Sequence, residues 1–222
     1  MSTVFPLPCR LSRHLPGTRL AVAALTAALM LLGSMGTASA HFLGGRWPYA
    51  GGSSVLWLSY RNDAGAYPDY SSAVSSAASN WYSTPTPLGP YSVSGSAKIV
   101  ANTIYDSSVS YWGITHVYTE TCVLWFCWNP EISYQDCTSP CAGSDYDSAT
   151  FTLNRYTMGG LTSAQKLKVA THEFGHGFGL GHSSCTAIMR QGYVSWSTPQ
   201  THDNYDVNQR YPSSVWSSPY GC

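Results

Sequence analysis

Three histidines and a glutamate have the residue types and spacing of a catalytic metal site. His172 and His176 are four residues apart, so on a helix both imidazoles project to the same side and can bind one metal ion. Glu173 follows His172 directly, which would put its carboxylate beside the metal without making it a ligand. There it could accept a proton from water as a general base. The pattern predicts metal-assisted hydrolysis.

A catalytic zinc site takes three protein ligands and leaves one tetrahedral position for water. His182 can be the third ligand only if the chain leaves the helix and turns back. Glycines favour such a turn, because they adopt positive φ freely and are costly inside a helix. Three of them separate His176 from His182: Gly177, Gly179 and Gly181. We therefore expect one zinc ion, bound by His172, His176 and His182.

The helix that must carry the first two histidines is predicted by its own pattern. Thr162 and Gln165 form the T-x-x-Q pattern of a capping box, which places the start of the helix near Thr162. Apolar residues then recur at spacings of three and four, so one face of the helix points toward the core. These residues are Leu167, Ala170, Phe174 and Phe178.

The rest of the chain predicts strands and one earlier helix. Residues 69–82 predict a helix, because Ala73, Ala77 and Trp81 are spaced by four and prolines follow. Runs of β-branched and aromatic residues predict strands. The predicted strands span 55–60, 98–105, 111–120 and 148–156, and a short turn joins the second to the third.

Composition bounds the class of protein. With 44% apolar and 10% charged residues, the chain of 222 residues can form a real hydrophobic core. Eleven basic residues balance eleven acidic ones, which argues against a nucleic-acid binder that relies on a basic patch. No internal repeat or long low-complexity linker divides the chain, so one domain is expected.

The N-terminus has the order of a signal peptide. Three arginines lie in residues 1–19, an uncharged apolar run covers 20–32, and Ala38-Ser39-Ala40 forms an A-x-A cleavage site. The apolar run is shorter than the roughly 20 residues that a membrane-spanning helix needs, so no stable membrane anchor is expected. We predict that residues 1–40 are removed and that residues 41–222 form a single secreted, extracellular domain.

Cysteine usage agrees with export. Of the seven cysteines, Cys9 would be removed with the signal peptide. Six would remain, and an even number in an oxidising compartment predicts three disulfides, whose pairing the sequence leaves open. The alternative, a zinc site of four cysteines, needs reduced thiols. The six are Cys122, Cys127, Cys137, Cys141, Cys185 and Cys222.

The histidine motif resembles a known family. His172 to His182 has the form H-E-x-x-H-x-x-G-x-x-H, the zinc signature of the metzincin metallopeptidases. The downstream Ala187-Ile188-Met189 resembles their Met-turn. Ser183 and Tyr193 resemble the matrixin branch. More loosely, Ala77-x-x-x-Trp81 is similar to the first helix of matrixin catalytic domains, and Asp203-x-x-Asp206 up to Tyr211 is similar to their C-terminal helix.

The resemblance implies a fold and a set of roles. The fold is α+β, a metzincin-type catalytic domain with a twisted, mostly parallel sheet, an active-site helix, a Met-turn and a C-terminal helix. The activity is that of a zinc endopeptidase that hydrolyses protein or peptide substrates with Zn-activated water and Glu173 as general base. Met189 would form the floor of the site. Tyr193 would line the pocket for the side chain after the scissile bond.

The sequence departs from the matrixin pattern in several respects. Gln191 stands where matrixins usually have a proline, which is a departure at the substrate pocket. The chain has no counterpart of their pro-segment, and His116 alone does not make the second, structural zinc site of vertebrate members. Calcium has no support beyond Asp145 and Asp147, where the calcium-loop pattern is missing. We expect a monomer.

A function of another class stays open on the sequence alone. A secreted recognition module could bind a wall polymer or glycan through tyrosines and tryptophans, with a non-catalytic zinc site. Such a closed site needs a fourth protein ligand, and no obvious candidate lies near the motif. The aromatic residues of the C-terminal segment are Trp196, Tyr205, Tyr211, Trp216 and Tyr220.

Overall fold

The structure is a computed structural model that describes residues 42–123, 126–132, 145–192 and 194–216. The chain divides into two compact units, Met1–Thr37 and Ala38–Cys222, and every described residue belongs to the second. No helix within the described residues is long and apolar enough to cross a membrane.

Five strands form one sheet in the order β2-β1-β3-β7-β4. β1 (Leu56–Asn62) pairs in parallel with β2 (Leu88–Ser92) and with β3 (Ile99–Ile104). β3 pairs in parallel with β7 (Ser148–Asn154), and β4 (Gly113–Tyr118) pairs antiparallel with β7. The predicted α+β class with a mostly parallel sheet is confirmed, and β4 is the antiparallel edge strand.

Strand pairing differs from what the local pattern suggests. The two predicted strands joined by a short turn are β3 and β4, but β7 lies between them in the sheet. The sequence analysis also missed β2, whose residues LGPYS include a glycine and a proline, both weak strand formers. It missed the two-stranded hairpin of β5 (Thr121–Val123) and β6 (Phe126–Trp128) as well.

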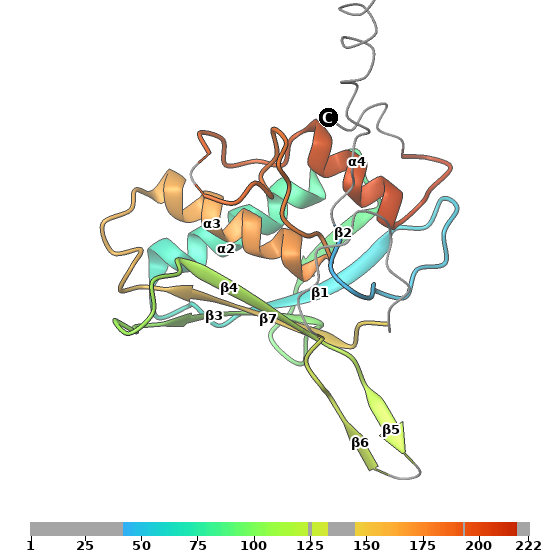
Figure 1. Cartoon of the computed structure of the whole chain (residues 1–222), viewed down its shortest axis with the longest axis horizontal. Coiled ribbons are helices and arrows are strands. Elements are labelled where there is room, and N and C mark those ends of the chain that lie inside the picture. Colours follow the sequence, from blue (N-terminus) through green and yellow to red (C-terminus); the bar gives the residue numbers. More distant parts are fainter. Residues whose placement is uncertain (1–41, 124–125, 133–144, 193, 217–222) are drawn as a thin grey trace, which may run out of the picture. The chain divides into compact units, whose positions relative to one another are not determined.

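Helices α2 (Pro68–Tyr82) and α3 (Ser163–Gly177) lie side by side on one face of the sheet (Figure 1). The predicted stripe of α2 is confirmed, because Ala73, Ala77 and Trp81 are all buried. The Trp81 indole Nε1 donates to the carbonyl of Thr171 at 2.8 Å. This bond fixes α2 against the middle of α3, next to the metal-binding motif.

Aromatic side chains of α3 and of its C-cap residue Phe178 join the helix to the sheet and to α2. The rings of Phe151 on β7 and Phe174 lie 4.8 Å apart, and those of Trp81 and Phe178 lie 5.5 Å apart. All four side chains are fully buried. Since burial of one large apolar side chain contributes about 2–3 kcal/mol, this packing holds the inner face of α3 firmly and leaves its opposite face for the histidines.

The C-terminal helix α4 (Thr201–Arg210) confirms the third helix that the resemblance implies. It holds the first described residues in place, because the Arg210 guanidinium donates to the carbonyl of Leu43 at 2.8 Å. The Tyr211 hydroxyl donates to the carbonyl of Phe178, also at 2.8 Å. α4 therefore contacts both the beginning of the described chain and the end of α3.

Candidate metal centre

The start of α3 agrees with the capping prediction. The Thr162 hydroxyl accepts a hydrogen bond from the Gln165 amide at 3.3 Å, and the Gln165 side chain accepts one from the Thr162 amide at 2.8 Å. Ala170, Phe174 and Phe178 are fully buried, and Leu167 packs against the core while partly exposed. Because these apolar residues occupy one face of α3, His172 and His176 project from a different face.

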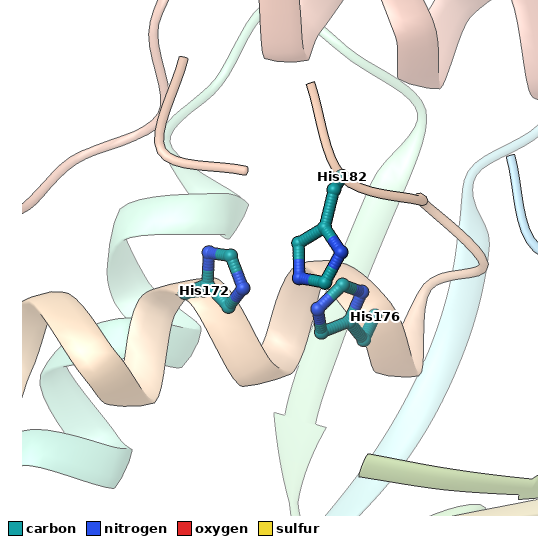
Figure 2. Close-up of side chains that lie close together, drawn as sticks. All are labelled: His172, His176 and His182. Atoms are coloured by element: carbon teal, nitrogen blue, oxygen red, sulfur yellow. The ribbon is translucent and has the colours of Figure 1, made fainter. Parts of the chain in front are cut away.

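The three predicted histidines meet at one point. Figure 2 shows the rings of His172 and His176 rising from α3 and that of His182 reaching back toward them from the following loop. One ring nitrogen from each lies within 4.8 Å of the others. Among the described residues, no other group of three or more His, Cys, Asp or Glu side chains is placed to hold a metal ion.

A tight turn brings His182 to the other two. The Phe178 amide donates to Phe174, and the Leu180 amide donates to Gly175 at 3.0 Å, which ends α3. Gly179 adopts a φ of +89°, which favours glycine. The expectation of three turn glycines is wrong in part, because Gly177 is the last residue of α3 and Gly181 does not adopt positive φ.

Backbone carbonyls orient two of the imidazoles. Nδ1 of His172 lies 2.8 Å from the carbonyl of Ile188, and Nδ1 of His176 lies 2.8 Å from that of Leu180. Since a carbonyl only accepts, each Nδ1 carries the proton and leaves Nε2 with a lone pair. Burial lowers the pKa of His172 to about 4 and that of His176 well below its usual value. Both are neutral at pH 7, as zinc ligands must be.

Three neutral, oriented imidazoles within reach of one point fit Zn²⁺, which binds histidine nitrogen in catalytic sites. A closed structural site would need a fourth protein ligand, and the described cluster offers three histidines. The donor set therefore matches a catalytic centre better than a closed one.

Glu173 lies beside the triad in contact with the edge strand. Its side chain is buried, and the Thr115 hydroxyl of β4 lies 2.6 Å from its Oε2. Burial raises the pKa of Glu173 to about 7, against the opposing effect of the Thr115 hydrogen bond. A Cβ at position 113 would lie 2.6 Å from Glu173 Oε1, so a residue larger than Gly113 would displace this carboxylate.

The segment predicted as a Met-turn is fully buried. Ala187, Ile188 and Met189 are all inaccessible to solvent, and the amides of Ile188 and Met189 donate to the Asp203 carboxylate at 2.7 and 3.1 Å. The same carboxylate accepts the Gln200 amide at 2.6 Å. The sequence analysis gave Asp203 only a place in the C-terminal helix. Asp203 lies three residues after Gln200, as in a capping box, and this spacing could have predicted that its carboxylate binds backbone amides.

A cleft of about 510 Å³ runs past the triad. β4 with its flanking residues forms one wall, and α3 with the loop after Met189 forms the other. Gln191 lines this cleft, whereas Tyr193 lies outside the described residues. The lining comprises Tyr111, Trp112, Gly113, Ile114, Thr115, His116, Glu131, Lys168, Val169, His172, Glu173, His176, His182, Gln191 and Gly192.

The remaining titratable candidates have other partners. His116 contacts the Glu131 carboxylate on the wall of the cleft, and His202 lies 3.3 Å from Asp206 within α4. Asp147 pairs with Lys98 at 3.1 Å. His41 lies outside the described residues. Calcium gains no support, because neither Asp145 nor Asp147 belongs to a described cluster of potential metal ligands.

The aromatic residues suggested for a recognition surface are mostly occupied by packing. Tyr211 is fully buried, and Trp196 and Tyr205 pack against the core while partly buried. Tyr220 lies outside the described residues. Trp196, Tyr205 and Tyr211 are therefore packing residues and not an exposed platform of the kind that a recognition module would need.

Comparison with known families identifies the domain. The matrixin family model matches residues 96–211, more than half of the 222 residues, from β3 to the end of α4. A search of curated proteins finds no match. Together with the histidine triad, the match shows that the chain belongs to the matrixin family of zinc endopeptidases.

Proposed function

We propose that this chain is a secreted matrixin endopeptidase in which Glu173 is the general base and then the general acid. Its carboxylate lies in the cleft, next in sequence to one of the histidines, and is held by Thr115. This arrangement is the single observation that carries the proposal. A raised pKa suits a group that must take up a proton near neutral pH and release it again.

The metal and the protein side chains have separate roles in the proposed mechanism. His172, His176 and His182 would hold the zinc ion, which would supply a Lewis acid for the substrate carbonyl and for water. Glu173 takes the proton of the attacking water and passes it to the leaving amine, so that one carboxyl group serves both steps. Thr115 keeps the carboxylate oriented, and the carbonyls of Ile188 and Leu180 hold His172 and His176 in the required tautomer.

We assign the two remaining site residues to supporting roles. Met189 forms the floor of the site, a role that its complete burial and its contact with the α3 backbone at Gly175 support. We assign the part of the cleft beside Gln191 and Gly192 to the side chain after the scissile bond, and we propose that Tyr193, the next residue in sequence, belongs to its wall.

The decisive experiment is the variant Glu173→Ala. Loss of a general base lowers the rate by roughly 10²–10⁴-fold, so peptide hydrolysis should nearly vanish while zinc content and circular dichroism stay at wild-type values. Glu120→Gln, an exposed acid outside the cleft, is the control and should keep full activity. Wild-type activity of Glu173→Ala would overturn the mechanism, and activity that survives zinc chelation would overturn the proposed use of zinc.

We further propose that residues 1–40 are a signal peptide and that residues 41–222 are the mature, monomeric enzyme. The burial of Phe42 and the bond from the Leu43 amide to Gly179 at 3.0 Å support a mature chain that starts near this point. N-terminal sequencing of secreted protein should begin at His41, and light scattering should give the mass of one chain. Secreted protein that retains residues 1–40 would contradict the assignment.

Three disulfides complete the proposal for the mature enzyme. Cys127 and Cys185 are each disulfide-bonded in the structure, which supports oxidation of the mature chain. Thiol titration of the denatured secreted protein should find no free cysteine before reduction and six after it. Free thiols in the unreduced, active enzyme would contradict this.

A further inference from the structure

We propose that Lys168 makes the pocket after the scissile bond selective for a carboxylate side chain, so that the preferred substrates carry Glu or Asp at that position. The inference rests on the proposed function of the cleft and names the class of substrate that it takes. It begins with the place of Lys168 on α3, one helical turn before His172.

Lys168 belongs to the same face of α3 as the histidines and lines the cleft with them. Its ammonium Nζ donates to the carbonyl of Gly192 at 3.0 Å and lies 5.9 Å from the centre of the Trp112 ring. The ammonium thus lies between the two walls of the cleft, beside the segment assigned to the pocket. It is the one lysine or arginine among the described residues that line this cleft.

The surroundings of this ammonium favour an anion. Its side chain is buried, and burial lowers the pKa of the Lys168 amino group, because the charged form has lost part of its hydration. A substrate carboxylate next to the ammonium would restore favourable electrostatics. A second lysine side chain at the same place would meet like charge.

The opposite end of the cleft has the opposite charge. Glu131 lines the cleft beside His116. His116 follows Trp112 by four residues, or about 13 Å at the usual rise per residue of a strand. A carboxylate of the substrate would be repelled there and attracted near Lys168. The charges of the described lining residues therefore place an acidic side chain of the substrate at the Lys168 end of the cleft.

A second buried lysine of α3 provides a matched control. Lys166 lies two residues before Lys168, so it points elsewhere on the helix. Its Nζ pairs with Asp69 at 3.3 Å and lies over the ring of Tyr70 at 4.8 Å. It does not line the cleft. Its replacement changes the charge of α3 without changing the proposed pocket.

The test measures kcat/KM for four fluorogenic peptides that differ only in the residue after the scissile bond, which is Glu, Gln, Leu or Lys. The zinc-loaded mature enzyme should prefer Glu over its isostere Gln by roughly tenfold, equivalent to about 1.4 kcal/mol. Lys168→Met should reduce this ratio to about one, Lys168→Arg should keep it, and Lys168→Glu should turn the preference toward the Lys peptide. Lys166→Met should leave the ratio at its wild-type value.

The ratio separates a role in selection from a role in holding Gly192. A purely structural Lys168 would change the rates for all four peptides by the same factor, and that result would overturn the inference, as would equal rates for Glu and Gln in the wild type. Either result, with hydrolysis that still needs zinc and Glu173, leaves the proposed function intact. Absence of zinc-dependent hydrolysis of every peptide would overturn both.

Discussion

The sulfur of Met189 occupies the space that a side chain at position 175 would need. A Cβ on Gly175 would collide with this sulfur, and it would also lie 3.0 Å from Cζ2 of Trp81. Gly175 stands between His172 and His176 on α3, so the methionine lies directly beneath the helix that carries two of the three histidines. The packing therefore requires a glycine at position 175. Its close contact with Met189 sets the distance between α3 and the buried segment 187–189.

Gly175→Ala should therefore destabilise the enzyme and weaken zinc binding. Forcing an extra methyl group into a packed core costs typically 1–3 kcal/mol, and the displaced helix would separate the histidines. Urea denaturation and competitive zinc titration measure the two effects. Gly177→Ala is the control on the same helix, because its Cβ would meet Ile99 at an ordinary 3.6 Å. Equal stability and zinc affinity for the two variants would show that the contact with Met189 is unimportant.

Local features of the site were predictable from the sequence, because short-range rules determine them. The spacing of His172 and His176 and the capping box at Thr162 each involve residues within one turn of a helix. The order of the sheet was not predictable in this way. β7 inserts between β3 and β4 through contacts between residues far apart in sequence. β2 was missed because parallel pairing along β1 outweighs the poor strand propensity of Gly89 and Pro90.

The role of Asp203 shows the same limit within the site. Its carboxylate accepts the amides of Ile188 and Met189, fourteen or more residues away, and no local pattern links them. Even the glycine-rich turn was predicted only in outline, since Gly179 alone of the three adopts positive φ.

Asp203→Asn should loosen the segment that contains Met189. Both carboxylate oxygens accept backbone amides, whereas an asparagine presents an NH₂ group that would face one of these donors. An unsatisfied buried polar group costs about 1–3 kcal/mol, so the free energy of unfolding should fall by that amount, with weaker zinc binding. Asp145→Asn, at an exposed position, should change neither quantity. Wild-type stability of Asp203→Asn would exclude this anchoring role.

Thr115→Val should lower kcat while KM stays nearly constant. The variant keeps the shape of the side chain but removes the hydroxyl that lies 2.6 Å from Glu173 Oε2, so the carboxylate loses its positioning partner on β4. A hydrogen bond to a charged group contributes about 1.5–3 kcal/mol, which corresponds to a decrease in kcat of roughly tenfold or more. Thr115→Ser restores the hydroxyl and should recover most of the rate. An equal loss in both variants would point to packing instead.

The contribution of His172 to the stability of the metal-free enzyme should decrease as the pH falls from 6.5 to 4. Burial lowers the pKa of His172 from 6.5 to about 4. A basic group with a lower pKa in the folded state binds protons more readily when unfolded, so its contribution is fully present above pH 6.5 and decreases toward pH 4. For His172 the two pKa values correspond to at most about 3 kcal/mol.

Urea denaturation of chelator-treated protein across this pH range tests the sign. The measurement should use the Glu173→Gln background, because the raised pKa of that carboxyl makes stability fall as the pH rises. Addition of His172→Gln should reduce the acid-induced loss. Parallel curves with and without His172 would show that the pKa of this imidazole is not lowered in the metal-free fold.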